Sequence, residues 1–517
     1  MPGGITPNRI ATIPLGDYNA DYYLTLIYQA MINLGWDIGY FDHDGIIAYT
    51  PISWASYSEE VSVRVKDDVV VFKSECVGYQ GLWTSYGKNQ KNLDLLFNEI
   101  AYAEYHLQSE LAETTQELMN SVPEKQFLSL DDPPMAGKEQ LHGFFSPIIP
   151  CEKYFITPLL VILNTLVFIG TSMAFKILPA FLSISQFHLS KGETIQDKMY
   201  LQFGFNHRTQ VLNGQVWRLL TSTFQHFSIV HLVFNMVALV YIGSLIECKL
   251  GKWNYLFMYL FTGIISGMIS VMFNYTEISA GASGAIFGLF GILLALVSTN
   301  FYERSARKAL LISTAIVVAF NIIPVGEGID NAAHFGGLIS GYIFGWIAYL
   351  GMNHQNLLIK KWGIAFVGSS IVIVFVGCSV AFMPRYQVTE FAALVDKTEA
   401  ITRDLNHDFY DGTVYGYGIG KDMSRQDKMD TIEQKGLPEL KDLKKMGAEF
   451  KKLTLPAKKA RAAKAEAKLV DLLCQLYQTL YLEFKEQNEE KYRPKIDSLT
   501  EKVNYVRMNW NDENLVK

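Results

Sequence analysis

The stretch Ser279-Ala-Gly-Ala-Ser-Gly-Ala-Ile-Phe-Gly-Leu-Phe-Gly291 decides how the rest of this chain is interpreted. It opens an apolar run that continues to about Val297, so Ser283 lies near one end of a predicted membrane helix. Gly281 and Gly284 flank this serine and leave the backbone amides unshielded, which lets a substrate come close. Glycines at intervals of three and four residues then form a small-residue face, against which another helix can pack closely.

Composition limits the classes of protein to which the chain can belong. Its 517 residues are too many for one ordinary domain, and half of them are hydrophobic. The formal net charge of −6 gives no reason to expect a nucleic-acid partner. The five cysteines are scattered and odd in number, which argues against a disulfide framework or a zinc site. We also expect no cleavable signal peptide, because the N-terminus lacks a basic region followed by an apolar core.

The apolar residues gather between about 155 and 383. Most of the apolar segments there are near the ~20 residues that a bilayer requires. The chain therefore predicts a multi-pass α-helical membrane protein in contact with the lipid bilayer. The candidate spans are 156–178, 228–246, 254–273, 282–299, 309–323, 332–350 and 362–382.

The regions on either side of the membrane part are polar. Residues 1–110 predict a small α+β domain, with helices over 19–34 and 89–107 and strands near 37–41, 46–50, 59–65 and 69–75. We interpret it as an interaction module whose partner is unknown. Residues 111–154 are expected to form a linker. Residues 384–517 predict a helical tail, in which Ala457–Lys468 forms a solvated helical surface.

Loop charges orient the predicted spans. After the second span, lysine and arginine occur in every second loop, whereas the charged residues of the intervening loops are all acidic, which is the positive-inside pattern. We therefore expect a bacterial cytoplasmic membrane protein with a cytoplasmic N-terminus and an extracytoplasmic C-terminus. The basic loops contain Lys249, Lys252, Arg304, Arg307, Lys308, Lys360 and Lys361, and the others contain Glu277, Glu327 and Asp330.

Polar side chains inside membrane spans are costly and indicate function. His231 and Asn235 are four residues apart, so they share one face of the second span. His226 is five residues before His231, a spacing that points the two rings apart and disfavours a shared metal. His334 lies in the first turns of the sixth span. Spans two, four and six are predicted to run in the same direction. His231, Ser283 and His334 can therefore share one depth in the membrane.

A serine beside a histidine is a nucleophile with its general base. We expect the small-residue faces of spans four and six to let Ser283 and His334 meet. His231 and Asn235 then face the same place as donors for a developing oxyanion. The alternative is that these polar residues only hold helices together.

This constellation resembles the rhomboid family of intramembrane serine proteases. The resemblance covers about residues 155–350, and the motifs occur in the family's order on the corresponding spans. Residues 351–383, the seventh span, and both polar regions lie outside it. The matching residues are Trp217-Arg218, His226, His231-Leu232, Asn235-Met236, Gly243, Glu247, Gly281-Ala-Ser-Gly284 and Ala333-His334.

The resemblance implies a six-helix core with a Ser283–His334 dyad and an oxyanion site formed by the Ser283 amide, His231 and Asn235. It also implies that substrates are single-pass membrane proteins cut near the outer membrane face, admitted past the short fifth span. Phe287 departs from the family, which often has tyrosine there, although phenylalanine can still stack on His334. Inactive relatives have lost the serine or the histidine, and this chain keeps both. The resemblance also implies that no metal and no cofactor are needed.

Two other classes of function compete with the protease. A rhomboid-like membrane protein without catalysis would bind transmembrane clients through the same fold. A small-solute transporter would place charged residues and broken helices near mid-membrane, and spans two to six contain no such acid or base. Asp330, one turn before His334, could be a third member of a triad, but capping of the sixth span explains its place equally well.

Overall fold

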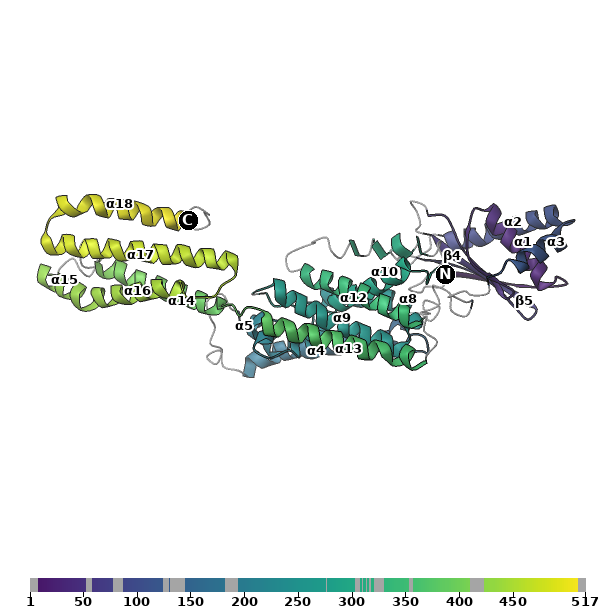
Figure 1. Cartoon of the computed structure of the whole chain (residues 1–517), viewed down its shortest axis with the longest axis horizontal. Coiled ribbons are helices and arrows are strands. Elements are labelled where there is room, and N and C mark those ends of the chain that lie inside the picture. The colour runs from purple at the N-terminus through teal and green to yellow at the C-terminus, as the bar shows by residue number, and fades with distance from the viewer. Residues whose placement is uncertain are drawn as a thin grey trace. The chain divides into compact units, whose positions relative to one another are not determined.

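The computed structural model describes residues 8–52, 58–77, 87–123, 130, 145–181, 194–275, 277–302, 330–352, 357–409, 423–509 and some positions between 307 and 319. Side chains are not described at 146, 177–181, 357–366 or 458. Two compact units are present (Figure 1). One contains the N-terminal sheet and the apolar helices up to Phe382, and the other consists mainly of Met383–Lys517.

The N-terminal region is an antiparallel sheet covered by helices. The strands expected from the sequence are β2 (Asp37–Asp42), β3 (Gly45–Tyr49), β4 (Glu59–Lys66) and β5 (Val69–Cys76), and α1 (Ala20–Asn33) and α2 (Lys88–Leu107) are the expected helices. The sheet order is β1-β5-β4-β3-β2. The edge strand β1 (Asn8–Pro14) was not expected. This short segment ends in proline, and its pairing with β5 is what identifies it as a strand.

The expected boundary of this region at residue 110 is wrong. Helix α3 (Leu111–Asn120) lies in the segment interpreted as a linker. Leu111, Leu118 and Met119 pack on the same hydrophobic cluster as α1 and α2, so the helix belongs to the folded region. The reason is burial of an amphipathic face, which short helices require for stability.

One face of the sheet buries polar and charged side chains. Tyr49, Glu60, Lys73 and Glu75 are all at most 8% exposed. The Tyr49 hydroxyl donates to Glu60 at 2.8 Å, and the Lys73 ammonium lies 2.6 Å from Glu75. Burial, followed by the neighbouring Glu75 carboxylate, raises the pKa of Glu60 from 4.5 to about 7, whereas Lys73 and the Tyr49 hydrogen bond act in the opposite direction.

This raised pKa predicts a pH-dependent sheet. Between pH 4.5 and about 7 the folded chain holds a proton on Glu60 that the unfolded chain has released, so stability falls as pH rises through this window. Glu60→Gln is expected to remove that fall, which amounts to about 3 kcal/mol at most. Hydrogen exchange of the β4 and β5 amides, corrected for the intrinsic pH dependence of exchange, measures it.

A matched control is Glu117→Gln on the exposed face of α3, which should keep the wild-type pH dependence. Exchange protection in Glu60→Gln that falls with pH as steeply as in the wild type would contradict this assignment.

The apolar helices lie close to their expected positions. They are α4 (Ile156–Phe181), α8 (Ile229–Leu250), α9 (Lys252–Phe273), α10 (Ser283–Ser298), α12 (Asn331–Met352) and α13 (Leu357–Phe382). Within the described part of the chain, four helices are long and apolar enough to cross a membrane, and they lie in α4, α8, α9 and α12. Ser283–Ser298 and Val367–Phe382 are shorter apolar helices. The expected fifth span at 309–323 lies mostly outside the described residues.

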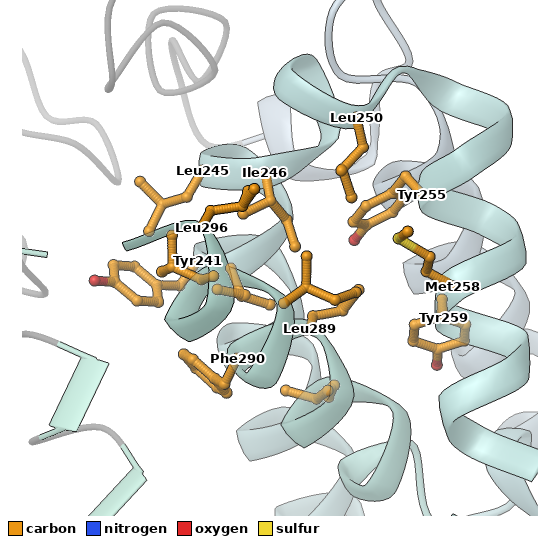
Figure 2. Close-up of a cluster of buried hydrophobic side chains, with 14 of the residues drawn as sticks. Tyr241, Leu245, Ile246, Leu250, Tyr255, Met258, Tyr259, Leu289, Phe290 and Leu296 are labelled. Atoms are coloured by element: carbon orange, nitrogen blue, oxygen red, sulfur yellow. The ribbon is translucent and has the colours of Figure 1, made fainter. Parts of the chain in front are cut away.

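Helices α10 and α12 approach each other at backbone distance, as their glycines predict. A Cβ atom added at Gly337 would lie 2.0 Å from the Gly284 carbonyl oxygen, and one at Gly341 would lie 1.9 Å from that of Gly288. Only residues without a side chain allow this contact. On the remaining sides α10 packs in a large hydrophobic cluster with α8 and α9, which Figure 2 shows around Leu289 and Phe290.

The C-terminal unit is a bundle of helices (Figure 1). Its main helices are α14 (Val388–Leu405), α16 (Leu437–Phe450), α17 (Ala457–Glu486) and α18 (Glu489–Met508). The start of α17 is not wholly the solvated surface expected from its sequence. Ala463, Ala465 and Ala467 are buried, because alanine lets neighbouring helices pack closely. Lys464 and Lys468 stay exposed.

Candidate active site

Ser283 and His334 meet between two helices that are distant in the sequence. Ser283 is the first residue of α10 and His334 lies in the first turn of α12. The Ser283 Oγ is 2.9 Å from the His334 Nε2, which is hydrogen-bond distance. His334 is 8% exposed. The glycine contact between α10 and α12 explains how side chains 51 residues apart come this close.

Stacking against an aromatic ring orients the His334 imidazole. The Phe287 ring is stacked on it, with centroids 4.3 Å apart and planes 9° from parallel. Phe287 lies one helical turn after Ser283, so the helix that carries the serine also supplies the stacking surface. Among the described residues the other imidazole nitrogen, Nδ1, has no hydrogen-bond partner. Ser283 and His334 are therefore a hydrogen-bonded pair, called the dyad below, without a third described side chain on His334.

Asp330 has a different position from that of a triad member. Its Oδ1 accepts the Ala333 amide at 2.9 Å, which caps α12. Its Oδ2 accepts the Ser279 hydroxyl at 2.6 Å and also the Ser270 hydroxyl. This carboxylate therefore joins the loop before Ser283, helix α9 and the start of the helix that carries His334.

His231 lies on the serine side of the site. A Cβ atom added at Gly281 would be 2.9 Å from the His231 ring and 3.6 Å from the Ser283 Oγ, so both side chains border the same open face of Gly281. The φ of Gly281 is +134°, a conformation that residues with side chains rarely adopt. Gly281 is thus required both for its backbone conformation and for the space it leaves.

Asn235 is buried one turn along α8 from His231. Its side-chain amide donates to the His231 carbonyl oxygen at 2.9 Å. An amide nitrogen carries two donor hydrogens, so one remains for another acceptor. Both expected oxyanion donors therefore share one helix, and His231 also borders the serine.

His226 does not point away from His231 as the sequence spacing predicts. The two rings are edge to face with centroids 5.1 Å apart. Helix α8 begins at Ile229 with Ser228 as its cap, so His226 precedes the helix and helical spacing does not apply to it.

Trp217 and Arg218 support the segment before α8. The Arg218 guanidinium donates to the backbone oxygens of Leu201 and Phe205 and to the Gln215 side chain. It also lies over the Trp217 ring, 4.7 Å from the centroid. This segment comprises short helices, α5 (Ile195–Gln202), α6 (Arg208–Leu212) and α7 (Arg218–Thr221), and Arg218 joins the first of these to the last. Neither residue touches the dyad in any described contact.

Glu247 lies at the far end of α8 from His231 and supports a different helix. Its carboxylate accepts the backbone amides of Phe155, Ile156 and Thr157 at 2.6 to 3.0 Å. These amides begin α4 and have no partner within that helix. Glu247 therefore fixes α4 to α8 and has no contact with the reacting groups.

Sequence reasoning missed the polar face of α9. The Ser266 hydroxyl donates to the Ala333 carbonyl at 2.8 Å, and Ser270 donates to Asp330. Thr262, Ser266 and Ser270 recur at four-residue intervals, which places them on one face of the helix. That repeat was the signal for a third helix behind the dyad.

Part of the chain matches a known protein family. Residues 213–351 match the family model of the rhomboid domain. This part of the chain belongs to the rhomboid family. The rhomboid domain contains α8 to α12 and therefore both residues of the dyad, and the chain is a multi-pass helical membrane protein.

Three relatives show how far the likeness extends. The chain is 34% identical to RHOMBOID-like protein 4 of Arabidopsis thaliana over 28% of this chain and 37% of that protein. It is 39% identical to rhomboid protease GluP of Bacillus subtilis over 29% of this chain and 30% of GluP. It is 31% identical to rhomboid-like protease 2 of Toxoplasma gondii over 28% of this chain and 53% of that protein. These matches span about a third to a half of each relative's length.

Proposed function

We propose that this rhomboid domain is an intramembrane serine protease that uses Ser283 as its nucleophile and His334 as its general base. The observation that carries the proposal is the 2.9 Å contact between the Ser283 Oγ and the His334 Nε2. Two relatives named as rhomboid proteases, from Bacillus subtilis and Toxoplasma gondii, support it. The experiment is covalent labelling by a fluorophosphonate probe, with Ser283→Ala as the comparison.

The proposed reaction proceeds by acyl transfer. The Ser283 hydroxyl attacks a peptide carbonyl carbon and gives its proton to the His334 Nε2. The carbonyl oxygen becomes negatively charged and accepts hydrogen bonds from the Ser283 amide, His231 and Asn235. His334 then protonates the leaving amine, and the C–N bond breaks. Water, deprotonated by His334, releases the acyl group and restores the serine hydroxyl.

Phe287 and Asp330 assist without reacting. Stacking holds the imidazole plane with Nε2 facing the serine. The proposed reaction requires the neutral tautomer that carries its proton on Nδ1. The Asp330 carboxylate holds the loop before Ser283 against the start of α12. Reacting groups held in place this way need less reorganisation to reach the transition state.

The substrates are proposed to be single-pass membrane proteins, cut near the outer membrane face. The dyad lies in the first turns of α10 and α12, so it is close to one membrane surface. A six-helix core with a seventh span at α13, a cytoplasmic N-terminal region and an extracytoplasmic C-terminal bundle complete the proposal. This orientation rests on the alternation of loop charge, and we propose a bacterial cytoplasmic membrane as its location.

Asp330→Ala is expected to slow probe labelling of Ser283 by about ten- to a hundredfold, because small displacements of reacting groups cost rates of that order. Asp330→Asn should stay within a few-fold of the wild type, since its amide oxygen can still cap α12 and its nitrogen can bond a serine oxygen. Labelling rates and melting temperatures, measured on the same preparations, separate positioning from unfolding. Equal labelling rates in wild type and Asp330→Ala would show that the carboxylate only caps the helix.

A further inference from the structure

The C-terminal bundle carries opposite charge at its two ends. Residues 449–461 run from the last turn of α16 into the first turns of α17, and they contain five basic residues and one glutamate. Residues 483–491, which connect α17 to α18, contain four glutamates and two lysines. The 30 residues of α17 separate these ends by about 45 Å at 1.5 Å per residue. The basic end is defined here as residues 449–461 together with Arg385.

The basic end is attached to the first residues after the last apolar helix. The Gln387 amide donates to the Thr454 carbonyl at 2.9 Å, and the Thr454 amide donates to the Gln387 side chain at 3.0 Å. Lys459 lies over the Phe391 ring, 5.8 Å from its centroid. The α16–α17 turn thus lies beside the start of α14, at one end of the bundle (Figure 1).

The chain length keeps this turn near the membrane. Helix α13 ends at Phe382, an apolar side chain that is 84% exposed. The five residues from there to Gln387 reach at most about 18 Å when fully extended. Because the turn is hydrogen-bonded to Gln387, it lies within that reach of the residue that ends the span. The distance is of the order of the headgroup layer and a Debye length of about 8 Å combined.

The cations at this end are available to a partner. Arg385, Lys451, Lys452 and Lys459 are exposed. Within the part of the chain described, Lys451 pairs with Asp471 at 3.5 Å, a solvent-exposed contact, and the other three make no ion pair. Residues 385–391 and 449–461 contain six basic residues and two acids, Glu390 and Glu449, so an excess of positive charge remains even with Asp471 beside Lys451.

We propose that the basic end binds anionic phospholipid headgroups and so docks the C-terminal bundle on the membrane surface. Clustered lysines and arginines beside a membrane span are attracted to negatively charged lipids. The acidic far end would be repelled by the same surface, so the charge separation also sets the bundle's direction. The proposal concerns the leaflet that faces the bundle and is independent of catalysis and of which side that leaflet is on.

The test places a fluorophore on the turn. Ala457→Cys, in a full-length chain whose five native cysteines are replaced by alanine, is labelled and reconstituted into vesicles that contain headgroup-nitroxide lipid. One set is phosphatidylcholine, and the other also contains about 30 mol% phosphatidylglycerol. We expect quenching to rise about twofold with the anionic lipid and to return to the neutral-lipid level at about 0.5 M NaCl.

Two triple variants with equal changes in charge complete the test. Lys451→Gln/Lys452→Gln/Lys459→Gln should lose the increase in quenching. Lys435→Gln/Lys485→Gln/Lys491→Gln, at the far end, should keep it. Lys435 belongs to that end because Glu433, two residues before it, lies 3.6 Å from Lys485. Equal quenching in the two kinds of vesicle, or equal losses in the two variants, would overturn the proposal and leave the basic end to a partner other than lipid.

Discussion

Replacing Ser283 with alanine is expected to abolish covalent labelling by a fluorophosphonate probe and cleavage of a model single-pass membrane protein. The reason is that the Ser283 Oγ is the proposed nucleophile, placed 2.9 Å from the His334 Nε2. Removal of a nucleophile or its base removes the covalent pathway, with losses of about 10⁶ in kcat in serine proteases. His334→Ala should have the same effect on cleavage, because no other described side chain is hydrogen-bonded to the serine.

The matched control is Ser298→Ala, at the opposite end of α10. The Ser298 hydroxyl donates to the Ala295 carbonyl within its own helix and lies 3.2 Å from the Tyr342 hydroxyl of α12. Neither partner belongs to the dyad, so loss of this hydroxyl should leave labelling and cleavage near the wild-type level. Purified Ser283→Ala that still cleaves substrate fully would rule out the proposed chemistry. If the wild-type chain, folded and inserted, neither reacts with probe nor cleaves substrate, a rhomboid-like protein that binds transmembrane clients becomes the better interpretation.

Asn235→Ala is expected to lower kcat by about 10²–10³, the usual cost of losing one oxyanion donor, with little change in KM. A donor that meets the oxygen only when it becomes negatively charged stabilises the transition state and not the bound substrate. His231→Ala should be at least as severe, since the His231 ring borders Gly281 beside Ser283. Probe labelling of Ser283 should slow in both variants without disappearing.

Asn254→Ala provides a matched control for Asn235→Ala. The Asn254 side chain donates to the Leu250 carbonyl four residues earlier, the same local bond that Asn235 makes with His231, at a site remote from the dyad. It should therefore report the cost of losing the local bond alone. A normal kcat with a raised KM in Asn235→Ala would assign Asn235 to substrate binding or helix packing, and the oxyanion role would be withdrawn.

Local pattern accounts for the features that the sequence predicted correctly. The apolar helices start and end close to their expected residues because hydrophobic length is a property of a continuous segment. The glycines of α10 and α12 predicted a close contact because absence of a side chain has the same consequence wherever two helices meet. The direction predicted for His226 was wrong because helical spacing was applied to a residue that precedes the helix.

Segments whose structure depends on distant partners were not predictable in this way. β1 is a strand only through its register with β5, and α3 is folded only because its apolar face meets the helices on the sheet. Asp330 could be interpreted either as a cap or as part of a triad until its contacts with Ser279, Ser270 and Ala333 were known. One carboxylate bonded to three segments cannot be recognised from spacing along any one of them.

The sequence by itself determined the membrane class, the order of the apolar segments, and the presence of a serine and two histidines near the starts of three of them, because hydrophobicity and helical period act within a segment. Only the tertiary structure decided that Ser283 and His334 are at hydrogen-bond distance, that Phe287 stacks on the imidazole, and that Asp330 joins three elements. These distances depend on how far α10 and α12 slide and turn against each other. That register is set by backbone contacts at their glycines and by the serines of α9, which lie far apart along the chain.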